Sequence, residues 1–320
     1  MKVFENDLWI IGTGLMAKEY AKVLKALDVP FIAIGRGEKN YEEFRSEFGV
    51  TVYCGGLSKF LSESPKIPKK VIVTVGIEAL ADTTLQLLNY GVLDILLEKP
   101  GFGYPSEIKS IVNTKAENQT VLLAYNRRFY SSIRTVRKLI KADGGVTSFF
   151  FEFTEWSHSI RDLVKHPAEH NNWFFGNSTH VIDTAFYLGG KPKVLSAYHS
   201  GSIDWHPSSA IFVGSGISTS EALFSYTANW EAPGRWAIEI MTKKHRFILK
   251  PMEKLAVQVI GSVQINPIEI KDEEYDIDFK PGLYLQTRAF LENDYSDFCS
   301  ISEQFEMMDI YIKMSGYPYE

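Results

Sequence analysis

The feature that most constrains the fold is a glycine-rich turn between an apolar segment and a helical pattern near the N-terminus. Residues 8–11 are typical of a buried strand, and Gly12-Thr13-Gly14-Leu15-Met16-Ala17 follows them directly. Gly12 allows a tight turn, Gly14 lets a pyrophosphate approach the backbone, and Ala17 lets the next helix lie close to the strand. This arrangement predicts a dinucleotide whose phosphates lie at the helix N-terminus. The residues expected around it are Gly12, Thr13, Gly14, Leu15 and Met16.

Strand-like and helical patterns alternate over the first 124 residues. Further strands are predicted at residues 31–34, 50–53, 71–75, 92–97 and 120–124. Alternation at this spacing predicts a doubly wound parallel sheet, which is an α/β fold. Ligands bind beyond the carboxyl ends of the strands in such sheets, so we expect Thr74 and Val75 to contact the cofactor.

The end of the second strand bears on which dinucleotide is bound. Proteins that prefer NAD usually have Asp or Glu there, which binds the ribose 2′-OH. This chain has Gly35-Arg36-Gly37, followed by Glu38 and Lys39. Because a guanidinium suits a phosphate dianion, Arg36, with Lys39 nearby, predicts a preference for NADP(H), with NAD(H) also possible. The alternative is that Arg36 is an exposed turn residue and that Glu38 binds the ribose of NAD.

A second ligand-facing position lies at the end of the fifth strand. Residues 92–97 are mostly apolar and stop at Glu98-Lys99-Pro100. Pro100 cannot donate a ladder hydrogen bond, and it disfavours the helical conformation at Lys99. Lys99 is therefore expected at the sheet edge where ligands bind, either as a solvated charge or as a group directed at a substrate.

The glycine turn, Glu98-Lys99-Pro100 and the segment Tyr125-Asn126-Arg127-Arg128-Phe129 together resemble the Gfo/Idh/MocA family of oxidoreductases. The resemblance implies an N-terminal Rossmann domain, here residues 1–124, and a C-terminal domain, here residues 125–320, for substrate binding and oligomerisation. Family members build the second domain as an α/β domain around a large, open, mostly antiparallel sheet. The strand-rich pattern between residues 194 and 260 fits that description.

The resemblance also implies a reaction. Family members move a hydride between a nicotinamide and a carbon bearing a hydroxyl or ketone, usually on a sugar, cyclitol or nucleotide sugar. By this resemblance Lys99 lies beside the nicotinamide and touches the reacting oxygen. Glu98 and Asn126 are expected at the cofactor, and Arg127 at the substrate. The competing class is a non-catalytic NADP-binding sensor or regulatory protein on the same fold.

A helical pattern begins at His180, with Asn177 or Ser178 as a possible cap. Asp183 lies three residues on, so the two share a helical face. The segment resembles the family's helix that carries a histidine near the nicotinamide, which implies His180 as a second catalytic acid/base. Family members often have an aspartate four residues before this histidine. This chain has Gly176 there, so His180 works without that carboxylate or uses another. A capping or core role for His180 and a structural role for Asp183 are the alternatives.

The loop that precedes this helix is expected to set the substrate. Tryptophans offer apolar faces to a sugar ring. The predicted substrate-binding residues are Lys99, Arg127, Trp156, Trp173, Asn177, His180 and Asp183.

The same loop raises the question of a metal site, because four histidines lie between residues 158 and 180. His166 and His170 are four residues apart, which places side chains on one face of a helix. However, Pro167 interrupts that helix, and no third ligand has a familiar spacing. No metal is therefore predicted.

Composition limits the partners and the compartment. The chain has 34 Lys and Arg against 39 Asp and Glu, a formal net charge of −5, and no basic block, which argues against nucleic acid and anionic membranes. Two distant cysteines favour a reducing cytoplasm, and no apolar run reaches the roughly 18 residues of a membrane span. By the resemblance, the open sheet of the second domain is expected to join copies into a homodimer or homotetramer.

Overall fold

The computed structural model describes residues 7–38, 40–163, 167–206 and 208–318. The chain forms two compact units. Unit 1 comprises the chain up to Tyr125 and the segment Asp278–Glu306, whereas unit 2 comprises Asn126–Ile277 and the chain from Met307 onward. The sequence predicts that the second domain runs without interruption from residue 125. The structure instead returns Asp278–Glu306 to unit 1, because this segment supplies a strand and a helix to it.

Unit 1 is built on a seven-stranded sheet. In the order in which they lie side by side, its strands are β15 (Cys299–Ser300), β6 (Thr120–Leu123), β5 (Asp94–Leu97), β4 (Lys70–Val73), β1 (Leu8–Ile11), β2 (Ile32–Gly35) and β3 (Val52–Cys54). All neighbours are parallel except β15, which runs antiparallel to β6. Strands β1, β2 and β4 are buried along their whole length, as strands covered on both faces of a sheet are expected to be.

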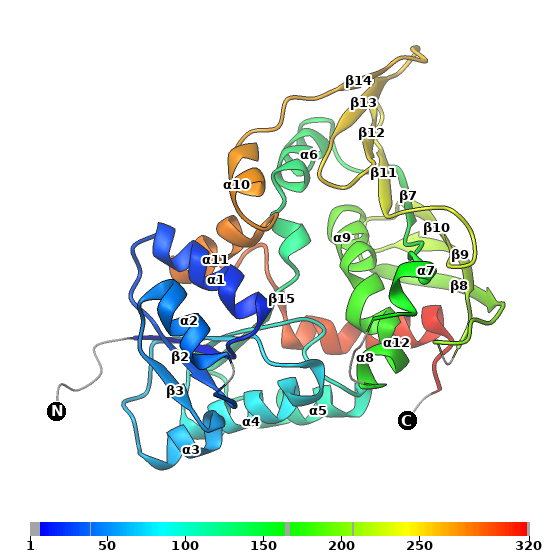
Figure 1. Cartoon of the computed structure of the whole chain (residues 1–320). Coiled ribbons are helices and arrows are strands. Elements are labelled where there is room, and N and C mark those ends of the chain that lie inside the picture. The colour runs from blue at the N-terminus through cyan, green and yellow to red at the C-terminus, as the bar shows by residue number, and fades with distance from the viewer. Residues whose placement is uncertain (1–6, 39, 164–166, 207, 319–320) are drawn as a thin grey trace. The chain divides into compact units, whose positions relative to one another are not determined.

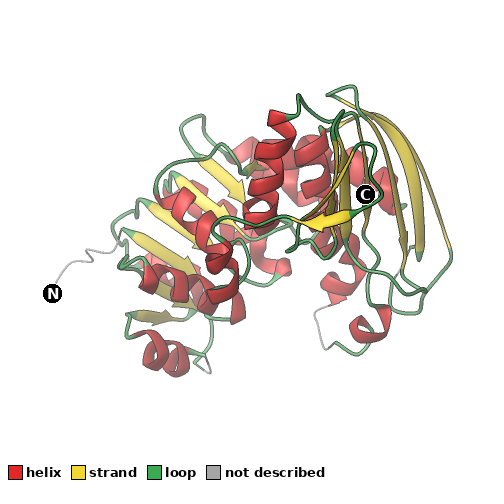
Figure 2. Ribbon diagram, turned by 90° about the horizontal axis from the view of Figure 1, so that it is seen from above, coloured by secondary structure: helices red, strands yellow, loops and turns green. Residues whose placement is uncertain are grey.

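Helices cover both faces of this sheet, as Figure 2 shows. They are α1 (Leu15–Ala26), α2 (Tyr41–Phe48), α3 (Gly56–Ser62), the short η1 (Ile77–Ala79), α4 (Leu80–Tyr90), α5 (Pro105–Thr114) and α11 (Leu283–Leu291). The late helix α11 packs against α1. The doubly wound α/β fold that the sequence predicts for this part of the chain is confirmed.

Unit 2 is built on an eight-stranded, mostly antiparallel sheet. In spatial order its strands are β14 (Ile265–Pro267), β13 (Ala256–Val259), β12 (His245–Leu249), β11 (Ala237–Met241), β7 (Ser148–Glu152), β10 (Leu223–Asn229), β9 (Ile211–Ser218) and β8 (Pro192–Ser200). Only β7 and β10 pair in parallel. Figure 1 shows these strands in green to orange. The large antiparallel sheet implied by the family resemblance is therefore confirmed.

The remaining elements include the helices of unit 2, which Figure 2 shows gathered on one face of the large sheet. They are η2 (Asn126–Phe129), α6 (Ser131–Ala142), α7 (Ser157–Ile160), α8 (Pro167–Asn171), the π-helical turn η3 (Phe174–Ser178), α9 (Thr179–Gly189) and α10 (Glu273–Asp278). Helix α12 (Ile301–Ser315) begins in unit 1 and continues into unit 2. Phenylalanines from β7 form the centre of the core, where the rings of Phe149 and Phe151 meet Phe186 of α9 edge to face. This packing fixes α9 against the middle of the sheet.

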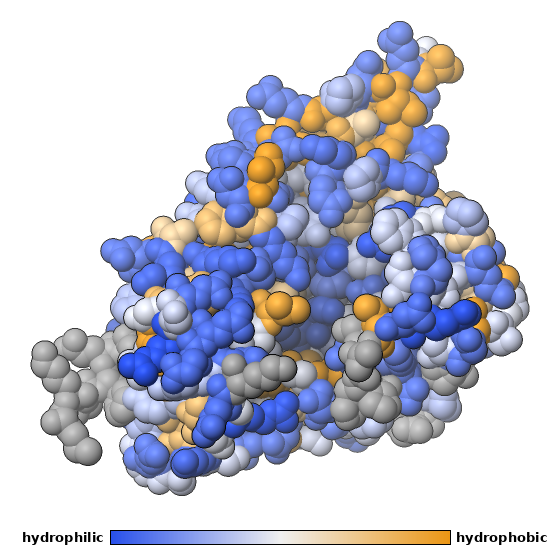
Figure 3. All heavy atoms as spheres, viewed as in Figure 1, coloured by the Kyte–Doolittle hydropathy of each residue, from blue (hydrophilic) through white to orange (hydrophobic). Residues whose placement is uncertain are grey.

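The end of the large sheet carries exposed apolar side chains. Ile260 and Val263, in the turn between β13 and β14, are 76% and 90% exposed. Figure 3 shows the resulting hydrophobic surface over these strands. Across the described residues, no helix combines the length and the apolar character that spanning a bilayer requires.

Candidate active site

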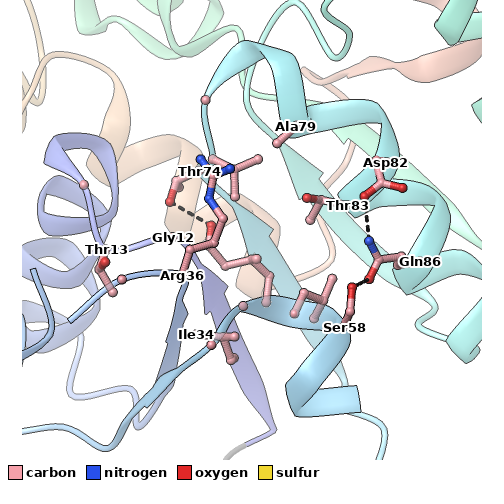
Figure 4. A pocket seen from close by; sticks show the side chains of 18 of the residues that line it. Gly12, Thr13, Ile34, Arg36, Ser58, Thr74, Ala79, Asp82, Thr83 and Gln86 are labelled. Carbon is pink, nitrogen blue, oxygen red and sulfur yellow. Dashed lines mark hydrogen bonds between the residues drawn. The ribbon is translucent and has the colours of Figure 1, made fainter. Parts of the chain in front are cut away.

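A pocket of about 530 Å³ lies at the carboxyl ends of β1, β2 and β4 in unit 1 (Figure 4). The predicted cofactor residues that line it are Gly12, Thr13, Gly14, Arg36, Thr74 and Val75. Leu15 and Met16 begin α1 next to the glycine turn, and Leu15 is 84% exposed. The structure therefore brings together, around one cavity, positions that are up to about sixty residues apart in the sequence.

The glycine turn has the geometry that a pyrophosphate needs. Gly12 has a φ of +122°, and a Cβ there would lie 2.5 Å from Thr74 Oγ1. By contrast, a Cβ on Gly14 would meet nothing within 4 Å. Gly14 also precedes α1 without a side-chain cap. Open space beside a helix N-terminus whose N–H groups lack a side-chain cap fits the phosphates of a dinucleotide.

Arg36 extends over this pocket in Figure 4. Its side chain is 72% exposed, and Nη2 lies 3.4 Å from Oε1 of Glu78. The exposed guanidinium is available to an anionic group on the cofactor. Glu38, the alternative ribose ligand, is not among the described residues that line the pocket. Lys39 lies outside the described residues.

The opposite wall of the pocket is polar, a feature that the sequence does not predict. Ser58 Oγ donates to Gln86 Oε1 at 2.7 Å, and Gln86 Nε2 donates to Asp82 Oδ2 at the same distance (Figure 4). Ser58 lies in the first turn of α3, and Asp82 and Gln86 lie on α4. Their amide, carboxylate and hydroxyl groups suit the polar edges of a nucleotide.

Lys99 follows β5 at the same edge of the sheet as the pocket. It is partly exposed, and its peptide bond to Pro100 is cis. The turn is held from the returning segment, since the buried Gln304 donates from Nε2 to the Pro100 carbonyl at 3.2 Å. Lys99 therefore sits on a braced turn, as a group with a fixed target requires.

Glu98, the predicted cofactor residue before Lys99, is held by a tyrosine. Tyr20 donates from its hydroxyl to Glu98 Oε1 at 3.2 Å. Burial raises the pKa of the Glu98 carboxyl, while Lys99 and Lys280 act to lower it. Lys280 was not predicted, because it comes from the returning segment, and its Nζ lies 2.9 Å from the sulfur of Met16. Lys280 is thus, with Lys99, one of two lysines that act on the Glu98 carboxyl, and it lies near the start of α1.

In unit 2, Arg128 and Asp183 form a buried, bidentate ion pair. Arg128 Nε donates to Asp183 Oδ2 at 2.8 Å, and Nη2 donates to Oδ1 at 2.6 Å. Both side chains are 5% exposed or less. Because both carboxylate oxygens accept from Arg128, the contacts favour the structural alternative for Asp183 over substrate binding. The pair ties α9 to η2, which begins with the buried Asn126.

His180 lies in the first turn of α9 and is 6% exposed. Its ring centre lies 6.2 Å from that of Trp236. Two arginines lie close to the Trp236 ring, with Arg127 at 4.4 Å and Arg235 at 4.6 Å, and Arg235 also lies 4.5 Å from the Trp156 ring. Burial lowers the pKa of the Arg127 guanidinium. We call these four residues the Arg–Trp stack; it places two positive charges near the histidine.

Glu155 is the residue of this region that the sequence reasoning missed. It is 2% exposed and accepts hydrogen bonds from Asn177 Nδ2 and Ser178 Oγ. Burial raises the pKa of its carboxyl to about 7, against the lowering effects of Ser178, Arg235 and Asn177. Ser178 precedes α9, as predicted, but its hydroxyl serves Glu155 and makes no cap hydrogen bond. The predicted substrate residue Asn177 is likewise engaged by Glu155.

The two predicted tryptophans occupy different environments. Trp156 is 49% exposed and lines a second pocket, of about 610 Å³, together with Glu155, His158, Arg161 and Trp230. Trp173 is 8% exposed, and its ring meets that of Trp205 edge to face at 5.7 Å. Of the pair, only Trp156 offers an open aromatic face.

Metal binding finds no support in the described part of the chain, where no three His, Cys, Asp or Glu side chains form a group that could hold an ion. His166 lies outside the described residues. His170, the other half of the spaced pair, packs its ring near Trp173 and Trp205.

The part of the chain that contains the glycine turn and the pocket matches a known protein family. Residues 7–126 match the model of the Gfo/Idh/MocA oxidoreductase family, described as having an NAD-binding Rossmann fold. The match covers this domain alone, and it identifies residues 7–126 as similar to the NAD-binding Rossmann domain of that oxidoreductase family. No curated protein matches the chain.

Solved structures resemble the chain over nearly its whole length. Levoglucosan dehydrogenase in complex with NADH aligns with a TM-score of 0.78 at 16% identity, covering 96% of this chain and 95% of the other. UDP-N-acetylglucosamine 3-dehydrogenase from Acidithiobacillus ferrooxidans aligns with a TM-score of 0.74 at 12% identity, covering 97% and 96%. An oxidoreductase from Agrobacterium radiobacter with NAD⁺, L-tartaric acid and magnesium aligns with a TM-score of 0.76 at 13% identity, covering 95% and 93%. At these identities the likeness establishes the fold of both units.

Proposed function

We propose that the protein transfers a hydride between NADP(H) and a hydroxyl- or ketone-bearing carbon of a sugar, cyclitol or nucleotide sugar. The observation that carries the proposal is the position of Lys99, at the sheet edge whose glycine turn forms the dinucleotide pocket. Levoglucosan and a nucleotide sugar are named for two of the similar structures, and we extend that substrate class to this chain.

The nicotinamide would supply or accept the hydride, and the protein would manage the proton. Lys99 donates from Nζ to the substrate oxygen, which gains a proton when the carbon gains a hydride. This hydrogen bond stabilises the charge that develops on that oxygen in the transition state. His180 is the second acid/base, and the exposed face of Trp156 supports the sugar ring.

Preference for NADP(H) rests on Arg36. The position that carries an acid in NAD-preferring enzymes carries an exposed guanidinium here, and that group lies over the pocket. NAD(H) remains a second cofactor for the same site.

Substitution of Lys99 tests the proposed role directly. Lys99→Met keeps much of the side-chain length and removes the donor, so we expect NADPH binding to stay intact and turnover to fall by about a hundredfold or more. Turnover is followed by nicotinamide absorbance with a panel of ketosugars and nucleotide sugars, and cofactor binding by NADPH fluorescence. Lys109→Met, on the exposed side of α5, is the matched control. Turnover that survives in Lys99→Met contradicts the assignment.

A non-catalytic dinucleotide sensor is the second candidate, favoured only by Gly176 in place of the usual acid. It predicts tight NADPH binding with no turnover by the wild-type protein on any member of the panel. The two candidates are therefore separated by the wild-type measurement alone, before any variant is made.

We further propose that the outer face of the large sheet joins copies of the chain. Tyr198 of β8, Val213 of β9 and Leu223 of β10 are 69%, 42% and 60% exposed. Tyr198 lies directly opposite Val213, and Leu223 opposite Ile217, so these side chains share one face of the sheet. An apolar sheet face of this kind is typical of a protein interface.

A further inference from the structure

Glu155 is a buried acid that the proposed reaction leaves without a role. It lies three residues beyond the end of β7, in which Phe149 and Phe151 are buried. Phe153 and Thr154, between the strand and Glu155, are buried as well, so the chain stays in the core past the end of the strand. A buried carboxylate is costly unless hydrogen bonds and opposite charges compensate it, so its neighbours indicate its purpose.

The hydrogen bonds of Glu155 lead to the start of α9. Asn177 Nδ2 lies 3.0 Å from both carboxylate oxygens, and Ser178 Oγ donates to Oε1 at 2.8 Å. Both donors belong to η3, the π-helical turn from which α9 continues, and His180 is the second residue of α9. Such turns are rare in proteins, and those that occur are often found at functional sites. Glu155 therefore holds the π-helical turn that precedes α9, and the position of this turn sets the position of His180 in the first turn of the helix.

Burial places the titration of Glu155 in the neutral range, against the lowering effect of the positive charges around it. Arg235 Nη1 lies 4.0 Å from Oε2, and Arg127 also acts on the carboxyl, while burial raises its pKa to about 7. His158 and Glu231 line the adjoining pocket. When ionised, the carboxylate has two oxygens that accept from the donors of Asn177 and Ser178. When protonated, one of these oxygens becomes an O–H donor, which Ser178 Oγ can accept but Asn177 Nδ2 cannot, so the contact with Asn177 is weakened.

We propose that Glu155 is a positioning residue for His180. Its ionised carboxylate holds Asn177 and Ser178, and through them the first turn of α9, in the geometry in which the histidine acts. The inference rests on the proposed function, in which His180 carries a proton. It also identifies the carboxylate that serves this helix start, where Gly176 offers none.

Steady-state kinetics across pH test the proposal. Glu155→Gln keeps the shape but turns an amide N–H toward the Asn177 donor, so kcat should fall by about a hundredfold while KM stays within about twofold. The wild-type kcat should rise with pH through about 7, as the carboxyl ionises, and this rise should vanish in Glu155→Gln. Glu155→Asp should keep the rise with a smaller kcat. Glu152→Gln, on β7 beside Lys250, is the matched control and should behave as wild type.

Histidine-selective NMR reads His180 without any turnover. Its signal, assigned by its loss in His180→Asn, should move in Glu155→Gln and stay in place in Glu152→Gln. If Glu155→Gln does not fold, Ser178→Ala removes one of the donors and should move the signal in the same direction. An unmoved signal, or a pH rise retained in Glu155→Gln, overturns the proposal. A moved signal in a protein that turns over nothing supports the positioning contact and defeats the proposed function instead.

Discussion

At the scale of single residues, charge decides what each part of the candidate site can bind. Arg36 lies exposed over the pocket at the glycine turn, where it forms a 3.4 Å ion pair with Glu78. Arg128, by contrast, is buried inside unit 2 in an ion pair with Asp183. Both are arginines beside a site, yet only Arg36 has a guanidinium that a ligand can reach.

Arg36→Ala should change the choice of cofactor. Loss of a charge-assisted hydrogen bond to a 2′-phosphate costs about 1.5–3 kcal/mol, so KM for NADPH should rise about tenfold to a hundredfold. KM for NADH should change little, because NADH lacks that phosphate. Steady-state kinetics with both cofactors measure this, with Arg45→Ala on α2 as the control. An equal loss with both cofactors would assign Arg36 to the shared part of the dinucleotide.

Asp183→Asn should destabilise the protein. It leaves the Arg128 guanidinium buried without its charge partner, which costs about 3–5 kcal/mol. Urea unfolding measures the change, and Glu239→Gln, which breaks the more exposed pair with Arg246 on the sheet surface, should have little effect. If Asp183→Asn unfolds like wild type but raises KM for substrate, Asp183 is a substrate ligand after all.

Residue-level prediction is strongest where a local pattern carries the chemistry, and contact of these residues with a dinucleotide stays a prediction. Gly12, Gly14 and Arg36 lie where the strand–turn–helix pattern places them, around one pocket. Glu155 had a local signal too, since it directly follows an aromatic, strand-like segment. The role proposed for Glu155 could not be predicted from the sequence, however, because its partners Asn177 and Ser178 are more than twenty residues away along the chain.

At the scale of elements, the turn between β1 and α1 uses its two glycines for different reasons. Gly12 must be glycine for the fold, since its backbone is left-handed and Thr74 fills the space beside it. At Gly14 the space beside the backbone is open, so we expect glycine to be needed there only for the ligand. The two positions can therefore be separated by experiment.

Gly14→Ala should weaken dinucleotide binding with little change in the melting temperature, because the added methyl enters the space of the pyrophosphate. Gly12→Ala should lower the melting temperature itself, because a Cβ 2.5 Å from Thr74 Oγ1 forces the turn to move. NADPH titration and thermal unfolding of both variants measure the two effects. Equal melting temperatures in wild type and Gly12→Ala would show that the turn tolerates a side chain.

The elements of unit 1 could be predicted in proportion to their length and apolar character. Strands β1, β2, β4, β5 and β6 lie within or beside the apolar runs that predict them. Strand β15 has only two residues, Cys299 and Ser300, and it pairs with Leu122 and Leu123 from a distant part of the chain. No periodicity can reveal such a strand, which is why the second domain was predicted as continuous.

At the scale of the whole molecule, the outer face of the large sheet should govern assembly. Leu223→Glu places a charge among apolar side chains, so the mass measured by light scattering should shift from an oligomer toward a monomer. Leu93→Glu, an equally simple exposed change in unit 1, should leave the mass unchanged. A wild-type protein that is monomeric at micromolar concentration would refute this interface.

The return of Asp278–Glu306 to unit 1 has a consequence for synthesis on the ribosome. The strand β6 keeps an unpaired edge until Cys299 and Ser300 emerge, after nearly all of unit 2 has been made. The core of unit 2 is also incomplete until Tyr317 has been made, because its hydroxyl lies 2.6 Å from Nε2 of the buried His206. Neither unit can be finished before the last few dozen residues appear, so the nascent chain carries two incomplete cores at once. An open strand edge during that interval is a site at which nascent chains can pair with one another and aggregate.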